Sequence, residues 1–231
     1  MSVLLLQLAG PLQSWGAASR FPRRSTESAP TKSGVLGLLA AAQGRPRTAD
    51  LSDLAALRFG VRVDQPGTRV RDFHTAHHQA SGKAMPVTER FYLADAVFLA
   101  AVEGERALIE RLHAAVRAPH FLPFLGRRAC PPARRLDLGI RHDTGLEGAL
   151  LKHPWLASAW YRKQTTRTAP DQLPVLLDST PDDPPGDVVA DQPLSFDPRH
   201  RRYARRSVRH DAVPRPVEVP EHDPMPLLES D

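Results

Sequence analysis

The alternation of apolar and polar residues predicts that the chain begins with a strand, a long loop and a helix. Residues 2–9 are rich in Val and Leu and alternate poorly, which is typical of a strand covered on both faces. Gly10 and Pro11 end this strand. Thr31 is a candidate N-cap of a helix that ends at Gly44 and has apolar residues at positions 35, 36, 38, 39 and 42.

The following part of the chain adds strands, a hairpin and a second helix. Strands are expected at residues 59–64, 68–75, 87–93 and 97–102, and an amphipathic helix is expected at residues 105–116. The polar, turn-rich residues 76–86 predict that the hairpin between two of these strands projects from the body. This element order predicts an α+β fold with a ferredoxin-like (RRM-like) antiparallel sheet and helices on one face.

The pattern becomes looser after residue 119. We expect residues 1–178 to form one ferredoxin-like domain. Residues 179–211 are expected to be a linker and an arginine-rich segment, which form a small β-rich C-terminal part. Residues 212–231 contain five prolines together with acidic residues, and we expect them to be a disordered tail.

The positive charge of the chain is concentrated before residue 170. The net charge is +5, but residues 1–170 hold 24 Lys and Arg against 13 Asp and Glu, whereas residues 171–231 hold 7 against 13. Most of these cations are arginine, which forks onto phosphate oxygens and stacks on bases, so the composition favours a polyanionic partner. The alternative is an arginine-rich surface that is merely solvated.

Cysteine content and hydropathy indicate the cytoplasm. Cys130 is the only cysteine, which excludes an intramolecular disulfide and a cysteine-based zinc site. Residues 1–9 have no basic leader, and the longest later apolar stretch, residues 35–42, is far shorter than the roughly 20 residues that span a bilayer. We therefore expect a cytoplasmic protein that does not contact a membrane.

The loop and helix start of the opening unit form a candidate phosphate seat. The glycines of residues 10–16 permit close backbone approach, and Lys32 lies beside the free N–H groups at the helix N-terminus. No Walker motif is present. The alternative is ordinary packing, in which Gly34 and Gly37 let the helix lie close to the sheet and Trp15 covers the core.

Two further segments carry candidate chemistry. His74, His77 and His78 have no metal-ligand spacing, so we expect neither a metal site nor a cofactor; His74 could act as a general base. Residues 121–131 join an aromatic cluster to a glycine and twin arginines, with Cys130 expected to be a small buried residue. The arginine run of residues 199–209 either adds polyanion affinity or forms a solvated edge strand.

Four ordered motifs within residues 2–155 resemble one family. They are LAGPLQSWG at residues 8–16, PTKSGVLGLL at residues 30–39, RDFHT at residues 71–75 and LGRRACP at residues 125–131. This combination is similar to the CasD family of type I-E CRISPR Cascade subunits, within the RAMP superfamily. The resemblance implies a ferredoxin-like body with a protruding thumb hairpin, here about residues 75–87.

The resemblance also implies a non-catalytic subunit that binds the 5′ handle of the guide RNA (crRNA) and bridges a CasA-type large subunit and a CasC-type backbone subunit. Target DNA would be reached only indirectly, through the complex. The motif positions that carry over as RNA contacts are Gln13, Trp15, Lys32, Ser33, Arg71, His74, Thr75, Arg90, Arg127 and Arg128.

Two functions then compete. In the binding hypothesis, Lys32 and the arginines neutralise phosphates while Trp15, Phe73 or His74 stack on splayed bases. In the enzyme hypothesis, the protein is a metal-independent endoribonuclease that processes precursor crRNA, as relatives in the type I-C branch do, with His74, Tyr92 and Lys83 as catalytic groups. We favour binding, because the resemblance is to the I-E branch, where a separate subunit cuts the RNA.

Overall fold

The computed structural model describes residues 1–16, 23–165, 168 and 170–216. The elements, in chain order, are β1 (Ser2–Ala9), β2 (Leu12–Gln13), β3 (Arg23–Arg24), α1 (Lys32–Ala42), α2 (Ser52–Ala55), β4 (Arg58–Gln65), β5 (Thr68–His74), β6 (Thr88–Ala94), β7 (Val97–Gly104), α3 (Arg106–Arg117), β8 (Asp137–His142), α4 (Leu146–Lys152), α5 (Ala159–Gln164), β9 (Gln172–Asp178), β10 (Asp187–Ser195) and β11 (Arg202–Pro214). None of the helices described is long and apolar enough to cross a membrane.

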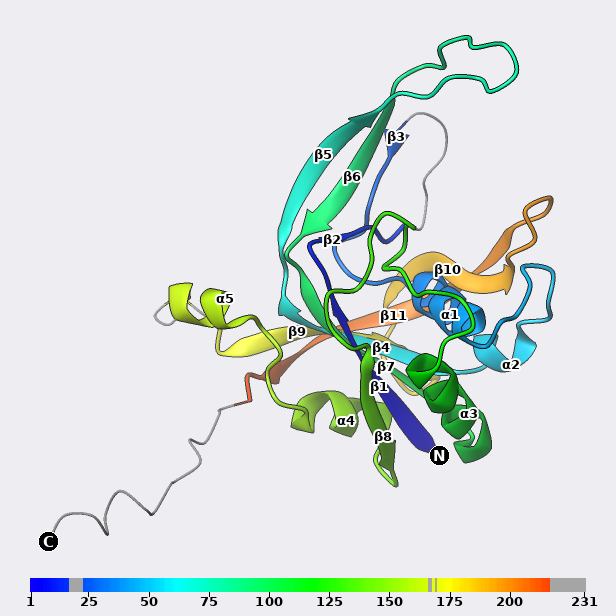
Figure 1. The fold of residues 1–231 in the computed structure, drawn as a ribbon. Helices are drawn as coiled ribbons and strands as arrows, with labels where there is room; N and C mark the ends of the chain where they lie inside the picture. Colours follow the sequence, from blue (N-terminus) through cyan, green and yellow to red (C-terminus); the bar gives the residue numbers. More distant parts are fainter. Residues whose placement is uncertain (17–22, 166–167, 169, 217–231) are drawn as a thin grey trace, which may run out of the picture.

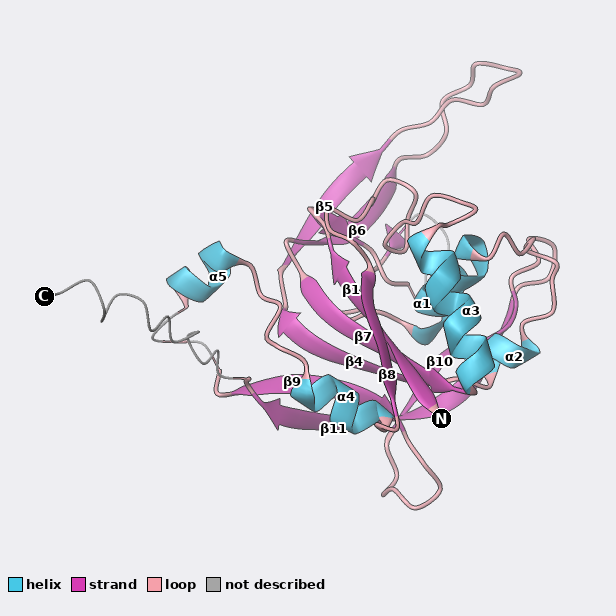
Figure 2. Cartoon of the chain, turned by 60° about the horizontal axis from the view of Figure 1, so that its bottom comes forward, coloured by secondary structure: helices cyan, strands magenta, loops and turns pink. Residues whose placement is uncertain are grey.

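The body is built on a seven-stranded sheet in the order β10-β11-β9-β4-β7-β1-β8, and all of its pairs are antiparallel. The expected α+β architecture with an antiparallel sheet is therefore confirmed. Helices α1 and α3 cover one face, whereas α4 packs on the opposite face (Figure 2). The expectation that all helices lie on one face is therefore wrong, because β1 is apolar on both sides and needs a cover on each.

Strand β1 shows how both faces are filled. All eight of its residues are buried. Leu4 and Leu6 belong to the larger core, which includes the apolar residues of α1 and α3, and Leu5 belongs to a second core with Leu150 of α4. The poor alternation of this segment thus predicted its environment correctly. Helix α1 follows as expected, with the Thr31 hydroxyl accepting a hydrogen bond from the Gly34 N–H at 3.3 Å.

A second, smaller sheet contains the β5–β6 hairpin, which rises from the body (Figure 1). Strands β5 and β6 pair from Thr68 and Ala94 at the base to His74 and Thr88 at the far end. The connecting residues 75–87 continue outward, with a single further bridge between His77 and Ala84. Strand β2 pairs with β6 at the base of the hairpin and β3 pairs with β6 near its far end, so two strands that precede α1 are attached to the hairpin.

The C-terminal strands belong to the main sheet. β11 pairs with β10 along one side and with β9 along the other, from Val208 opposite Asp178 to Pro214 opposite Gln172. Residues 187–214 were expected in a linker, an arginine-rich segment and the start of a tail; instead they extend the body. The remainder of the expected tail, residues 217–231, lies outside the described part of the chain.

Candidate functional site

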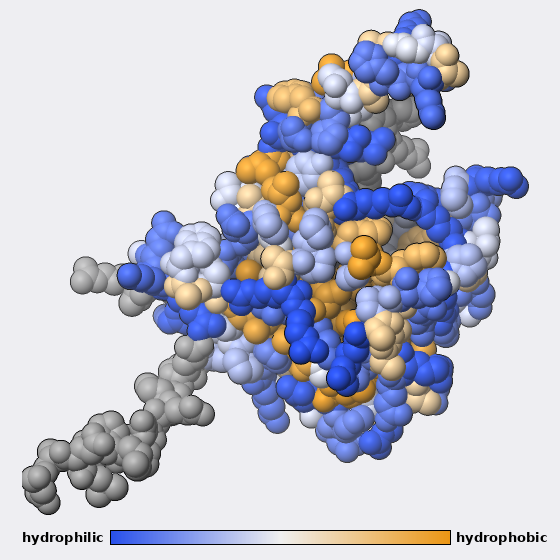
Figure 3. Space-filling model, viewed as in Figure 1, coloured by the Kyte–Doolittle hydropathy of each residue, from blue (hydrophilic) through white to orange (hydrophobic). Residues whose placement is uncertain are grey.

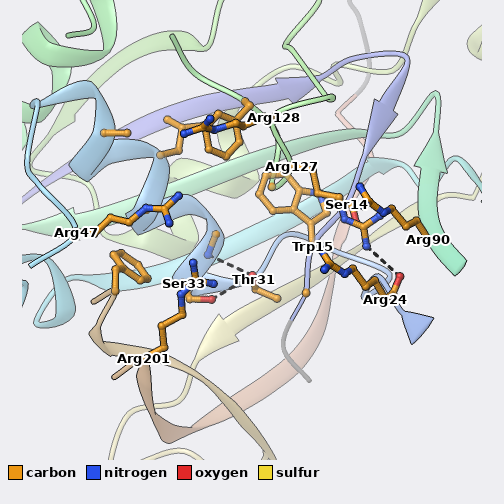
Figure 4. A pocket seen from close by; sticks show the side chains of 18 of the residues that line it. Ser14, Trp15, Arg24, Thr31, Ser33, Arg47, Arg90, Arg127, Arg128 and Arg201 are labelled. Carbon is orange, nitrogen blue, oxygen red and sulfur yellow. Dashed lines mark hydrogen bonds between the residues drawn. The ribbon is translucent and has the colours of Figure 1, made fainter. Parts of the chain in front are cut away.

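A cavity of about 1430 Å³ lies between α1, the outer part of the β5–β6 hairpin and two long loops. Its cationic lining residues are Arg24, Arg45, Arg47, Arg90, Arg127, Arg128 and Arg201, with His74 in addition. No Asp or Glu is among the described residues that line it. We call this cavity the arginine groove. Figure 4 shows arginines from separate segments gathered around Trp15 and Ser33.

Most of the groove's positive charge is not neutralised by the protein. Arg45 forms an ion pair with Asp53, with the guanidinium Nη1 at 2.7 Å from the carboxylate oxygen. Within the described ranges, the other six arginines have no carboxylate partner. Clustered cations without counter-charges in a concave surface raise the local potential and attract anions. The groove therefore favours a negatively charged occupant.

Apolar side chains supply much of the remaining lining, together with several Ser and Thr residues. Phe121, Leu122 and Tyr203 line the groove, with 50%, 87% and 40% of their surface exposed. In the space-filling view, apolar side chains gather between the projecting hairpin and the body (Figure 3). Exposed aromatic rings beside arginines can stack on unpaired bases while the guanidinium groups contact phosphates. This combination suits a single-stranded nucleic acid better than a small acid.

Arg127 and Arg128 are positioned by the loop that precedes them. Gly126 has φ of +85°, and a Cβ there would collide with the backbone oxygen of Ser14. Arg127 donates from Nη2 to the Arg24 carbonyl at 2.9 Å, and its guanidinium carbon lies 4.8 Å from the centroid of the Tyr92 ring. A planar cation stacked on a ring is pre-oriented for binding. The glycine therefore positions the arginine that follows it.

Lys32 does not serve as a free phosphate ligand. Its side chain is 5% exposed, and Nζ lies 2.8 Å from a carboxylate oxygen of Asp178 on β9. Burial lowers the pKa of Lys32 below its usual value, and the Asp178 carboxylate offsets part of this effect. The expectation that Lys32 neutralises RNA phosphates is wrong for this structure, because the ammonium group already has an internal partner.

The predicted phosphate seat at the α1 N-terminus already holds a carboxylate of the protein itself. The Lys32 backbone N–H donates to an Asp191 carboxylate oxygen at 2.7 Å, so this side chain of β10 takes the place expected for an anion. Arg206 of β11 joins both carboxylates, at 2.6 Å from Asp178 and 2.6 Å from Asp191. This buried network fastens α1 to the C-terminal strands.

Trp15 and Gln13 have structural roles. The Trp15 ring is fully buried and its indole N–H donates to Gln13 Oε1 at 3.0 Å, while the Gln13 amide donates to the Leu8 and Ala96 carbonyls. A Cβ at Gly34 would lie 2.8 Å from the Trp15 ring, so the glycine admits this ring against α1. The packing alternative for these residues holds, and Trp15 offers no exposed face on which a base could stack.

The other predicted positions fall into two groups. The groove brings together Ser33, His74, Thr75, Arg90, Arg127 and Arg128. Arg71 lies outside it, on the exposed surface of the β5–β6 hairpin, where its guanidinium carbon is 4.8 Å from the Phe73 ring centroid. Arg24, Arg45 and Arg47 were missed, because Arg24 lies in the two-residue strand β3 and Arg45 and Arg47 lie in an irregular segment, and none of these places carries a local motif. Arg201 lies in the run flagged for polyanion affinity, and β11, which carries most of that run, is an inner strand and not an edge strand.

The alternative catalytic residues do not converge. His74 lies opposite Thr88, four residues along β6 from Tyr92, which places the two roughly 13 Å apart along the hairpin. Tyr92 is 3% exposed and stacked beneath Arg127. Lys83 belongs to the outer connection beyond β5. Cys130 is buried, and burial raises the pKa of its thiol, which disfavours a nucleophile.

Comparison with known proteins assigns the chain to a family. The family described as CRISPR-associated protein (Cas_Cas5) matches residues 3–209. The chain belongs to this Cas5 family. The CRISPR system Cascade subunit CasD of Escherichia coli (strain K12) is 35% identical to this Cas5 chain over 185 residues, covering 71% of the chain and 82% of that protein.

Two solved structures agree with the family assignment. One, described as the crystal structure of a Cas protein, is 41% identical with a TM-score of 0.72, covering 92% of this chain and 95% of that chain. The other, from a CRISPR RNA-guided surveillance complex, is 35% identical with a TM-score of 0.76, covering 93% of this chain and 91% of that chain. The similarity thus extends over almost the whole of this Cas5 chain.

Proposed function

We propose that this Cas5 chain is a non-catalytic, cytoplasmic subunit of a type I-E Cascade surveillance complex and holds the 5′ handle of the crRNA in the arginine groove. The observation that carries the proposal is a groove lined by seven arginines and, in the described residues, by no carboxylate. Phosphates of a bound strand would supply the missing negative charge and release counterions. The 35% identity to a Cascade CasD subunit supports the same assignment.

The arrangement of the strands and helices supports this proposal. The chain order of a ferredoxin-like body is strand-helix-strand-strand-helix-strand, and the same order is found in β1, α1, β4, β7, α3 and β8. The four strands are neighbours in the main sheet, in the order β4-β7-β1-β8. Residues 75–87, at the end of the β5–β6 hairpin, would be the thumb. His74 and Thr75 belong to the groove lining, so the thumb begins at the edge of the groove. A strand in the groove would therefore contact the body and the thumb together.

Binding is favoured over cleavage by the chemistry of the groove. Metal-independent cleavage needs a base, an acid and a cationic stabiliser within reach of one phosphate. His74, Tyr92 and Lys83 are spread along the hairpin, and Tyr92 is covered by Arg127. Stacking and phosphate contacts require only the exposed aromatic rings and the unpaired arginines that are present.

Partners follow from the proposed place in the complex. A CasC-type backbone subunit and a CasA-type large subunit would lie on either side of this chain, and target DNA would be contacted only through the assembly. The solved structure with a TM-score of 0.76 is itself from an RNA-guided surveillance complex, which supports assembly with other chains.

The test is to incubate the purified protein with repeat-derived RNA and follow both mobility and length. We expect the RNA to shift without being shortened, and an excess of bulk nucleic acid to compete poorly. Metal-independent shortening that is lost in His74→Ala would overturn the non-catalytic assignment. Equal competition by unrelated RNA and DNA would overturn handle recognition.

A further inference from the structure

The arginine groove has a side chamber of about 380 Å³. Its lining residues are Arg24, Arg47, Arg90, Tyr92, Phe124, Gly126, Arg127, Arg128 and Ala129. We call it the arginine chamber. Five of its nine described lining residues are arginine, and none is acidic. Such a concentration of like charge is unfavourable unless an anion enters, because guanidinium groups close together repel one another.

Two of these guanidinium groups have unused donors. Arg90 Nε and Arg127 Nη1 are buried and have no hydrogen-bond partner in the described structure. Buried N–H groups are almost always paired, and an unpaired one is costly. An oxyanion in the chamber that accepts from these two atoms would satisfy both donors. The protein alone leaves the chamber incomplete in charge and in hydrogen bonding.

The geometry favours phosphate among the possible anions. Arg127 is fixed by its stack on Tyr92 and its bond to the Arg24 carbonyl, so it presents a planar fork rather than a mobile charge. A tetrahedral oxyanion can accept from several such forks at once, whereas a carboxylate has two oxygens. The chamber is also too small for a duplex. The α1 N-terminus, by contrast, is closed to anions because Asp191 fills it.

We propose that the arginine chamber is a phosphate site that binds inorganic phosphate in the free protein and one backbone phosphate of bound RNA. The RNA part of this inference rests on the proposed function; the binding of inorganic phosphate does not. The chamber opens from the groove through residues common to both linings, such as Arg90 and Arg127. The phosphate that enters it would fix the register of the strand.

The test is calorimetric titration of the full chain with inorganic phosphate, at an ionic strength held constant with potassium chloride. We expect saturable binding by the wild type, weakened about tenfold or more in Arg127→Gln and in Arg90→Gln. Arg128→Gln provides a third chamber variant if either of these fails to fold. Arg106→Gln is the matched control, because Arg106 is exposed on α3 and pairs with Glu110.

Each outcome decides the proposal. No phosphate binding by the wild type, or an equal loss in Arg106→Gln and the chamber variants, would show that only diffuse charge attracts the anion. Binding of repeat RNA is measured in parallel. Phosphate binding without RNA binding would overturn the proposed function alone, and RNA binding that is unaffected by Arg90→Gln and Arg127→Gln would overturn the role of the chamber in seating the strand.

Discussion

Lys32 provides a sharp test of how this molecule is built, because local sequence and tertiary structure assign it opposite roles. Its Nζ lies 2.8 Å from Asp178, and both side chains are nearly buried, with 5% and 12% exposed. If Lys32 is replaced by Met, the apolar stem is largely retained while the charge is lost. Asp178 keeps its contacts with Arg206 at 2.6 Å and with the Phe59 N–H at 2.9 Å.

The expected loss of stability follows from these contacts. Removing one partner of a buried ion pair costs about 3–5 kcal/mol when the remaining charge has no other partner. Because Asp178 keeps two partners, we expect Lys32→Met to reduce the free energy of unfolding by about 1–3 kcal/mol. At roughly 2–4 °C per kcal/mol for a chain of this size, Tm should fall by roughly 2–12 °C. Lys152→Met, on the exposed end of α4, is the matched control and should change Tm little.

The assay combines urea and thermal unfolding with the salt dependence of RNA binding. A buried lysine paired with Asp178 releases no counterion when RNA binds, so the slope of log K against log salt should be unchanged in Lys32→Met. A variant with wild-type stability and a slope reduced by about one would refute this reasoning and restore Lys32 to the RNA site.

Three further outcomes are expected. Burial lowers the folded-state pKa of Lys32 below 10.5, so the unfolded chain binds that proton more tightly than the folded chain. The difference in unfolding free energy between wild type and Lys32→Met should therefore widen as pH rises from the lowered pKa towards 10.5. A difference that stays constant over this pH range would contradict the argument. Trp15→Ala removes a fully buried ring and should cost about 3–5 kcal/mol in urea unfolding, and a loss below about 1 kcal/mol would contradict the packing role. Gly126→Ala should displace the loop from Ser14, weaken RNA binding and destabilise the fold by about 1–3 kcal/mol, since φ is +85°; wild-type affinity would refute the positioning role.

The opening strand and helix could be predicted because their signals are local. β1 is apolar on both faces, and α1 has Thr31 as its cap. β11 gave a weaker signal: a solvated edge strand was only one of two alternatives for residues 199–209, and only Val208 of its thirteen residues is buried. Pairing with β9 and β10 on its two sides holds it in the sheet instead of an apolar face. The position of such a strand inside the sheet cannot be predicted from its own residues.

The candidate site likewise contains residues that the sequence predicted and residues that it did not predict. The glycine before Arg127 and Arg128 marked them as a motif, and both line the groove. Lys32 was assigned wrongly because its partner Asp178 is 146 residues away, and Asp191 at the helix N-terminus is 159 residues away. A helix N-terminus looks like an anion site until the fold supplies its own carboxylate. Arg47 was missed because it belongs to an irregular segment and approaches the groove only through the tertiary fold.

The most direct test of the central claim is the salt dependence of repeat-RNA binding in a groove variant. In Arg47→Gln/Arg128→Gln, which removes two groove cations that have no described carboxylate partner, affinity should fall and the slope of log K against log salt should flatten by about two. Arg106→Gln, on the exposed surface of α3, should keep the wild-type slope. The same slope in the wild type, the groove variant and the control would contradict the assignment of the arginine groove as the RNA site.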